Sequence, residues 1–244
     1  MDSMLLLSRV RAVLIRQEET IVFSLIERAQ FHRNERVYKP RAFGPFVGED
    51  SLSGYLLHET ERIHARMRRY TSPDEHPFYQ DLPTPVLPAL SYPENPLRPC
   101  SINLNGEVRR IYETEILPLV CAPGDDSQYG SSAVCDVMCL QSLSRRIHYG
   151  KFVAESKLQS NPSLLEAAMR DGDRDELMKL VTDDHVERDV VSRVRKKAEL
   201  YGELDAGDAA ALRIDPDTVS DIYRKWIIPL NKRVQVEYLV QRGV

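Results

Sequence analysis

Apolar residues recur every three or four positions along most of the chain, which is the spacing of amphipathic helices. Residues 5–31 place Leu7, Val10, Leu14 and Ile21 on one face without a glycine or proline. The same period predicts helices at 51–69, 103–119, about 131–160, 162–170, 172–182, 183–202 and 216–241. Breaks are expected near Gly172, between Gly202 and Gly207, and at Pro229.

Nothing in the pattern indicates a β-sheet or a repeat protein. No run of alternating apolar and polar residues is flanked by hairpin signals, and no 20–50-residue unit recurs. Residues 32–49 hold two prolines and two glycines and are expected to form a loop. The sequence therefore predicts an all-α fold, with residues 1–244 as a single-domain multi-helix bundle.

The segment 71–99 differs from the rest, because it contains eight of the fifteen prolines. Proline at this density excludes a regular helix. The segment also carries Phe78, Tyr79 and several leucines, so we expect an ordered, extended stretch that lies over a helical surface. A flexible linker is the alternative.

The composition excludes several classes of protein. Hydrophobic residues make up 42% of the chain and charged residues 29%, which suits a globular protein. The net charge of −4 does not favour a nucleic-acid binder, and no apolar run reaches the ~20 residues of a membrane span. The N-terminal residues lack the features of a secretory signal or an organelle leader.

The cysteines and histidines do not predict a disulfide framework or a metal site. The four cysteines form no CxxC pair, so we expect reduced thiols in an intracellular protein. The run HETERIH at 58–64 departs from the HExxH spacing of zinc-binding helices, and its histidines are expected on a solvated helix face.

The stretch LQSLSRRIHYGKFVAESK at 140–157 places two cations beside an apolar face. On a helix, Arg146 and Lys157 lie about 20° apart in azimuth and roughly 16 Å apart along the axis, whereas Arg145 points about 100° away. Cations at such an edge are costly unless an anion meets them. The alternative is that their long stems lie on the apolar surface with the charged heads in water.

Three other helices carry polar residues near their apolar faces. Arg11 is one position from Val10, and Asp183 and Glu187 share a face at i,i+4, although Asp183 could instead cap its helix. Asn231 and Gln235 are also at i,i+4, in either a lined cavity or a hydrogen-bonded core pair. No catalytic triad or phosphate loop is present, so these groups favour a pocket for a small molecule with carboxylates.

Several of these stretches resemble one enzyme family over essentially the whole chain. They are IRQEETIVFSLIERAQF (15–31), SPDEHPF (72–78), GSSAVCD (130–136), CLQSLSRRIHYGKFVAE (139–155), KKAELYG (196–202) and VQVEYLV (234–240). The chain resembles the eukaryotic, all-helical chorismate mutases of plants and yeast. The resemblance implies an isomerase that rearranges chorismate to prephenate for phenylalanine and tyrosine biosynthesis, with no cofactor and no metal.

The resemblance also implies roles for the pocket residues. Arg11 and Arg146 would bind the two carboxylates, while Lys157 and Gln235 would donate to the ether oxygen. Glu187 would hold the ring hydroxyl, with Asp183 nearby. Asn231 stands where the family usually has threonine, which contacts a carboxylate.

The family further implies a homodimer with a regulatory site at its interface. Tryptophan would activate the enzyme there, and tyrosine or phenylalanine would inhibit it. The residues that match this site, including a loop at about 124–134, are Arg68, Arg69, Ser127, Gln128, Gly130, Ser131 and Val134. The alternative is that Gly130 is only a turn residue and that the two arginines form a solvated helix end.

Two questions stay open at the level of sequence. The main alternative function is a non-catalytic helical amino-acid sensor that retains only the effector site; a helical scaffold for protein partners is a third. An intact polar set favours the enzyme, because a sensor would be expected to have lost Arg146 or Lys157. The location is predicted to be cytoplasmic, with the plastid stroma as the alternative if a transit peptide is absent from this chain.

Overall fold

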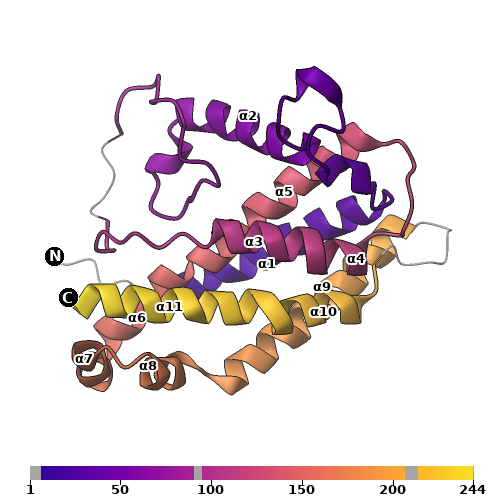
Figure 1. Ribbon diagram of the computed structural model, residues 1–244. Coiled ribbons are helices and arrows are strands. Elements are labelled where there is room, and N and C mark those ends of the chain that lie inside the picture. The colour runs from indigo at the N-terminus through magenta and orange to yellow at the C-terminus, as the bar shows by residue number, and fades with distance from the viewer. Residues whose placement is uncertain (1–6, 91–94, 207–213, 244) are drawn as a thin grey trace.

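Two long helices, α1 (Leu7–Ala29) and α5 (Tyr129–His148), pack side by side through the middle of the molecule. The computed structural model describes residues 7–90, 95–206 and 214–243, and no strand occurs among them. Helix α2 (Leu52–Arg66) packs on α5 as well, on the upper side in Figure 1. The all-α class predicted from the apolar period is confirmed.

A second group of helices packs around α11 (Ile228–Gly243). Its neighbours include α6 (Gly150–Ser160), α7 (Pro162–Asp171) and α8 (Arg174–Val181), which lie below it in Figure 1. Helix α9 (Asp184–Ala206) packs on α1 and on α10 (Pro216–Ile222). One hydrophobic core runs through both groups, and the faces of α1, α5, α6, α9 and α11 meet there.

Local chemistry sets several helix ends where the sequence predicts them. The Ser51 hydroxyl accepts a hydrogen bond from the Gly54 amide at 3.1 Å at the start of α2. Asp173 caps α8 in the same way, through the Glu176 amide at 2.9 Å. Gly172 ends α7 with a positive φ of 65°, a conformation that glycine adopts without steric cost.

The break predicted at Pro229 is wrong. Helix α10 continues through a π-helical turn (Tyr223–Ile227) into α11, and the proline lies just after that turn. A second π-helical turn (Tyr112–Ile116) precedes Pro118 and joins α3 (Asn105–Ile111) to α4 (Leu117–Val120). We attribute both continuations to the wider turn, which accommodates a proline that lacks an amide hydrogen.

The other differences concern where helices begin and end. The helix predicted from about residue 131 begins at Tyr129, and it is interrupted at Tyr149 between α5 and α6. Helix α9 continues past Gly202 to Ala206. Three stretches that carry sequence predictions lie outside the described residues. They are 5–6 of the first predicted helix, 91–94 of the proline-rich segment, and 207–213, where the break at Gly207 is expected.

The proline-rich segment, in its described parts 71–90 and 95–99, lies against α2, α3 and α5. The Phe78 amide donates to both carboxylate oxygens of Glu61 at 2.9 Å. Arg145 donates to Asp74 at 2.6 and 3.0 Å, so the arginine that points away from the apolar face holds this segment instead. The ring of His76 stacks on that of His148, with centroids 4.2 Å apart. These contacts give the extended stretch fixed partners on the helical surface.

The described helices show no candidate membrane span, since none of them combines the length and the apolar character that crossing a bilayer requires. Likewise, within the described ranges no three His, Cys, Asp or Glu side chains gather in a way that could hold a metal ion. The four cysteines are free thiols.

Candidate active site

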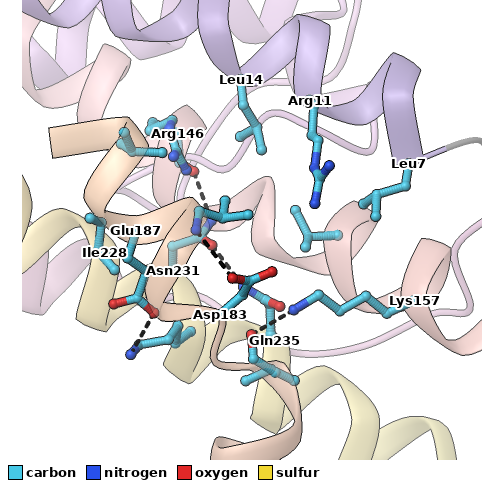
Figure 2. A pocket seen from close by; sticks show the side chains of 15 residues that line it. Leu7, Arg11, Leu14, Arg146, Lys157, Asp183, Glu187, Ile228, Asn231 and Gln235 are labelled. Atoms are coloured by element: carbon cyan, nitrogen blue, oxygen red, sulfur yellow. Dashed lines mark hydrogen bonds and ion pairs between the residues drawn. The ribbon is translucent and has the colours of Figure 1, made fainter. Parts of the chain in front are cut away.

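One pocket between the two helix groups is lined by all seven residues that the sequence singles out for substrate. Its walls come from α1, α5, α6, α9 and α11, and it encloses about 660 Å³ of empty space including its mouth. In Figure 2, Arg11 and Lys157 point into the same space from different helices. The seven residues are Arg11, Arg146, Lys157, Asp183, Glu187, Asn231 and Gln235.

Arg146 is a buried cation with unused donors. Its side chain is 4% exposed, and neither its Nε nor its Nη1 has a hydrogen-bond partner among the described residues. Burial lowers the pKa of the guanidinium, and Tyr223 and the nearby Glu18 carboxylate oppose that shift. Glu18 itself is occupied by Arg193, which donates to both carboxylate oxygens at 2.7 and 2.8 Å. Arg146 therefore keeps its donors for an anion in the pocket.

Lys157 lies on α6 and is held by the backbone. Its Nζ donates to the carbonyl oxygen of Val181 at 2.5 Å, which leaves further hydrogens on the ammonium group. Burial lowers the pKa of Lys157, Asp183 opposes that shift, and the positive charge of Arg11 adds to it. One ammonium hydrogen is thus directed at the Val181 carbonyl oxygen, and the others can donate into the pocket.

The two acids that line the pocket, Asp183 and Glu187, have different bonding partners. Asp183 caps α9, accepting from the amides of His185 and Val186 at 3.2 and 3.1 Å, and the Val186 amide lowers the pKa of this carboxyl. The capping alternative for Asp183 is therefore confirmed, although the residue also lines the pocket. Glu187 forms an ion pair with Lys232 at 2.8 Å.

Lys232 lines the pocket as well, but the apolar period does not predict it there. It follows Asn231 directly, so on a helical projection it points about 100° away from that residue. It reaches the pocket through its long stem, and its ammonium group contacts Glu187 and the Thr182 hydroxyl. The sequence signal for it is weak, because both partners lie on other elements that are distant along the chain.

The amides of Asn231 and Gln235 form a hydrogen-bonded pair in the pocket wall. Gln235 Nε2 donates to Asn231 Oδ1 at 2.9 Å, and Asn231 Nδ2 lies 3.1 Å from the carbonyl oxygens of both Arg146 and Ile147. The side chains of Gln235 and Asn231 are 4% and 7% exposed, respectively. The sequence allowed either a lined cavity or a hydrogen-bonded core pair. The structure shows both, since the two amides are hydrogen bonded to each other and also line the pocket.

The predicted effector residues fall into two groups that do not meet within one chain. Arg69 donates to Gln141 in the second half of α5 at 2.8 Å, and Arg68 donates to the Pro88 carbonyl. Ser127 and Gln128 precede α5, and Gly130, Ser131 and Val134 lie in its first two turns. Gln141 and Gly130 are about three helical turns apart, which is roughly 16 Å.

Comparison with known proteins identifies the family. Residues 128–236 match the family described as chorismate mutase type II. A relative named chorismate mutase, from Schizosaccharomyces pombe, is 46% identical over 97% of this chain and 96% of its own length. A chloroplastic chorismate mutase 1 from Petunia hybrida is 45% identical over 97% of this chain and 75% of its own length.

Solved structures agree with these sequence matches. AtCM1 with tyrosine bound in its allosteric site has a TM-score of 0.91 and 44% identity, covering 99% of this chain and 98% of that one. Aro7p chorismate mutase from Candida albicans, in complex with L-Trp, has a TM-score of 0.92 and 38% identity over 99% and 95% of the two chains. The chain therefore belongs to the chorismate mutase family of plants and fungi, isomerases that convert chorismate to prephenate.

Proposed function

We propose that chorismate rearranges to prephenate in the pocket between Arg11, Arg146 and Lys157. The observation that carries this proposal is the buried guanidinium of Arg146, whose Nε and Nη1 have no partner among the described residues. A planar guanidinium binds a carboxylate through two hydrogen bonds. Arg11 supplies a second cation at the same pocket, so two carboxylates of one substrate can be held apart.

The reaction itself needs no nucleophile. In this rearrangement the ether C–O bond breaks while a C–C bond forms, and negative charge grows on the ether oxygen. The protein then has two tasks, to hold the reactive conformer and to donate hydrogen bonds to that oxygen. Lys157 and Gln235 are the donors that we assign to the ether oxygen, and Glu187 is the acceptor that we assign to the ring hydroxyl.

Loss of chorismate absorbance with purified protein tests this assignment. Lys157→Ala is expected to lower kcat about 10²–10³-fold, the usual effect of removing one donor to a developing negative charge. Arg146→Ala is expected to raise KM about tenfold or more, because it removes charged hydrogen bonds to a carboxylate.

Arg145→Ala is the matched control for both variants. This residue is the neighbour of Arg146 on α5 but bonds Asp74 at the surface, so its kcat and KM should stay near wild type. Unchanged rates for both Lys157→Ala and Arg146→Ala would contradict the assigned site. A wild-type protein without mutase activity would instead favour the non-catalytic sensor.

We also propose that aromatic amino acids regulate the enzyme at an interface between two copies of the chain. Relatives are known with tyrosine, phenylalanine or L-Trp bound, the first two in an allosteric site. Because Arg69 bonds Gln141, which is roughly 16 Å from Gly130 along α5, one chain alone does not bring the two groups to one ligand. A homodimer would let the arginines of one copy face the loop of the other.

The surface of α2 and α5 supports such a homodimer. Ile63 and Met67 on or next to α2, and Val134 and Met138 on α5, are each about half exposed. Helix α2 packs on α5, so these side chains lie on neighbouring elements. Exposed apolar side chains on adjacent helices are typical of protein–protein interfaces.

Gly130→Val tests regulation and leaves the active site untouched. A Cβ at Gly130 would have no neighbour within 4 Å, so the fold tolerates it, whereas a ligand approaching the backbone would not. We expect wild-type basal kcat, with activation by tryptophan and inhibition by tyrosine or phenylalanine both lost. Gly106→Val on α3, also without neighbours, should keep the responses. If the wild-type rate is the same with and without tryptophan, tyrosine and phenylalanine, regulation is refuted.

The cellular location stays a proposal. We place the protein in the cytoplasm, with the plastid stroma as the alternative, because its relatives include both a chloroplastic petunia enzyme and a fungal enzyme. Imaging the tagged full-length protein in its own cells would decide between them.

A further inference from the structure

Asn231 has no hydrogen left for substrate. Its amide nitrogen lies 3.1 Å from the carbonyl oxygens of Arg146 and Ile147, in the last turn of α5. Carbonyl oxygens only accept hydrogen bonds, and those at a helix end need donors from elsewhere. Both amide hydrogens of Asn231 are therefore directed at the backbone, and the orientation of this side chain is fixed.

This arrangement dictates the orientation of the neighbouring amide. With its nitrogen directed at α5, Asn231 must turn Oδ1 toward Gln235, and an oxygen that can only accept requires a donor opposite it. Gln235 supplies that donor, because its Nε2 lies 2.9 Å from Asn231 Oδ1. One hydrogen of Nε2 is used in that bond, and the second remains for a ligand in the pocket.

The packing of α6 on α11 makes room for this pair. A Cβ at Gly150 would lie 2.6 Å from the carbonyl oxygen of Asn231 and 3.1 Å from its Nδ2. Only glycine at this position lets Asn231 come close enough to the end of α5. Gly150 therefore serves the close packing of these two helices.

We propose that Asn231 is a positioning residue, which sets the amide of Gln235 so that an N–H is always presented to the ether oxygen. The proposal rests on the function proposed above. It assigns Asn231 no contact with a substrate carboxylate, in contrast to the threonine that the family usually has at this position. A threonine hydroxyl both donates and accepts, so it would not fix the neighbouring amide.

The first test is a double-mutant cycle of kcat and KM with Asn231→Thr and Gln235→Ala. Asn231→Thr keeps a donor for the helix end and is expected to lower kcat about tenfold with little change in KM, because orientation of the donor is lost. Gln235→Ala is expected to lower kcat about 10²–10³-fold. The double variant should be no slower than Gln235→Ala, because Asn231 acts only through Gln235.

The second test uses the pH dependence of kcat, which a purely structural role would not move. In Gln235→Glu, the new carboxyl faces an oxygen that can only accept, so the protonated form is favoured and activity is lost with a high midpoint as pH rises. Adding Asn231→Thr places a hydroxyl there that can donate to the carboxylate. The midpoint should then fall by about one pH unit or more.

The charged groups around position 235 are the same in both backgrounds, so their influence cancels in the comparison. They are Arg11 on α1, Arg146 on α5, Lys157 on α6, Asp183 and Glu187 at the start of α9, and Lys232 on α11. Where Asn231→Thr does not fold, as judged by its melting temperature, Asn231→Ser serves in its place.

The outcomes separate this inference from the proposed function. Wild-type activity together with an equal midpoint in the two backgrounds would overturn the inference alone. Multiplicative losses in the cycle would instead show that Asn231 acts independently of Gln235, which also overturns the inference. A wild-type protein without mutase activity would overturn both proposals.

Discussion

At the scale of single residues, burial makes the pocket attractive to anions. Arg146 is nearly inaccessible to water and keeps unpaired donors, so the folded protein bears the cost of a buried charge until a ligand offsets it. Lys157 is partly buried and bonded to the Val181 carbonyl oxygen, and its pKa is lowered chiefly by burial. A substrate that carries two carboxylates restores favourable electrostatics to both groups.

The lowered pKa of Lys157 predicts the alkaline limit of activity. In the proposed role Lys157 must be protonated to stabilise the ether oxygen, so kcat/KM, which reports the free enzyme, should fall at high pH with a midpoint below the ordinary value of 10.5. Gln235 has no proton to lose, and the profile should be nearly flat from about pH 5 to 8. In Lys157→Arg the alkaline limb should disappear, because a guanidinium stays protonated, although kcat will be lower. An unchanged limb would assign it to another group.

At the scale of elements, the contact between α6 and α11 determines the shape of the pocket floor. Both helices contribute residues to the pocket, and they approach so closely at Gly150 that a Cβ there would overlap the backbone of α11. The interruption at Tyr149 separates α6 from α5, so Arg146 and Lys157 stand on different helices.

Gly150→Ala is expected to damage stability and activity together. The added methyl group would lie 2.6 Å from a backbone oxygen, which cannot move aside as a flexible side chain can. Overpacking of this kind typically costs about 1–3 kcal/mol of unfolding free energy. Urea titration and the chorismate assay measure the two effects. The control is Gly106→Ala, where no atom lies within 4 Å; equal behaviour of the two variants would contradict the close contact.

At the scale of the whole molecule, a histidine pair couples the proline-rich segment to the helices. The His76 Nε2 contacts the buried ammonium of Lys151, and the His148 Nε2 accepts from the Leu104 amide at 2.9 Å. Burial lowers the pKa of His76 to about 2 and that of His148 to about 4, and the charge of Lys151 adds to both shifts. Both rings are therefore neutral in the folded protein at neutral and mildly acidic pH.

Stability should fall as the pH drops below 6.5, the ordinary pKa of histidine. The folded pKa values lie below that of the unfolded chain, so the unfolded state binds more protons there and is stabilised relative to the folded state. Each histidine contributes up to about 1.4 kcal/mol per pH unit. Urea titrations at about pH 7 and pH 5 should show a smaller loss for His76→Phe than for wild type. The exposed His185→Phe should behave as wild type, and equal losses in all three would contradict this account.

The same titrations test the predicted single-domain organisation. One hydrophobic core joins the helix groups in the described residues, so one cooperative transition is expected at neutral pH. Two separated transitions would indicate two domains.

Sequence alone predicts the helices and all the polar residues of the pocket except Lys232. The apolar period is local and belongs to each helix, so it identified the faces of α1, α5, α6, α9 and α11 and the polar side chains beside them. It failed at Pro229 and Tyr149, where the choice between a break and a continued helix depends on a π-helical turn or on neighbouring helices.

The pairing of those polar groups depends on how the helices pack. The bonds from Asn231 to the carbonyls of Arg146 and Ile147 join residues 85 and 84 positions apart, and the ion pair of Lys232 with Glu187 joins two helices. Such pairings depend on how closely the helices approach, and this distance is set by contacts such as that of Gly150 with α11. Periodicity indicates which side chains face inward, but it does not indicate which atoms meet there.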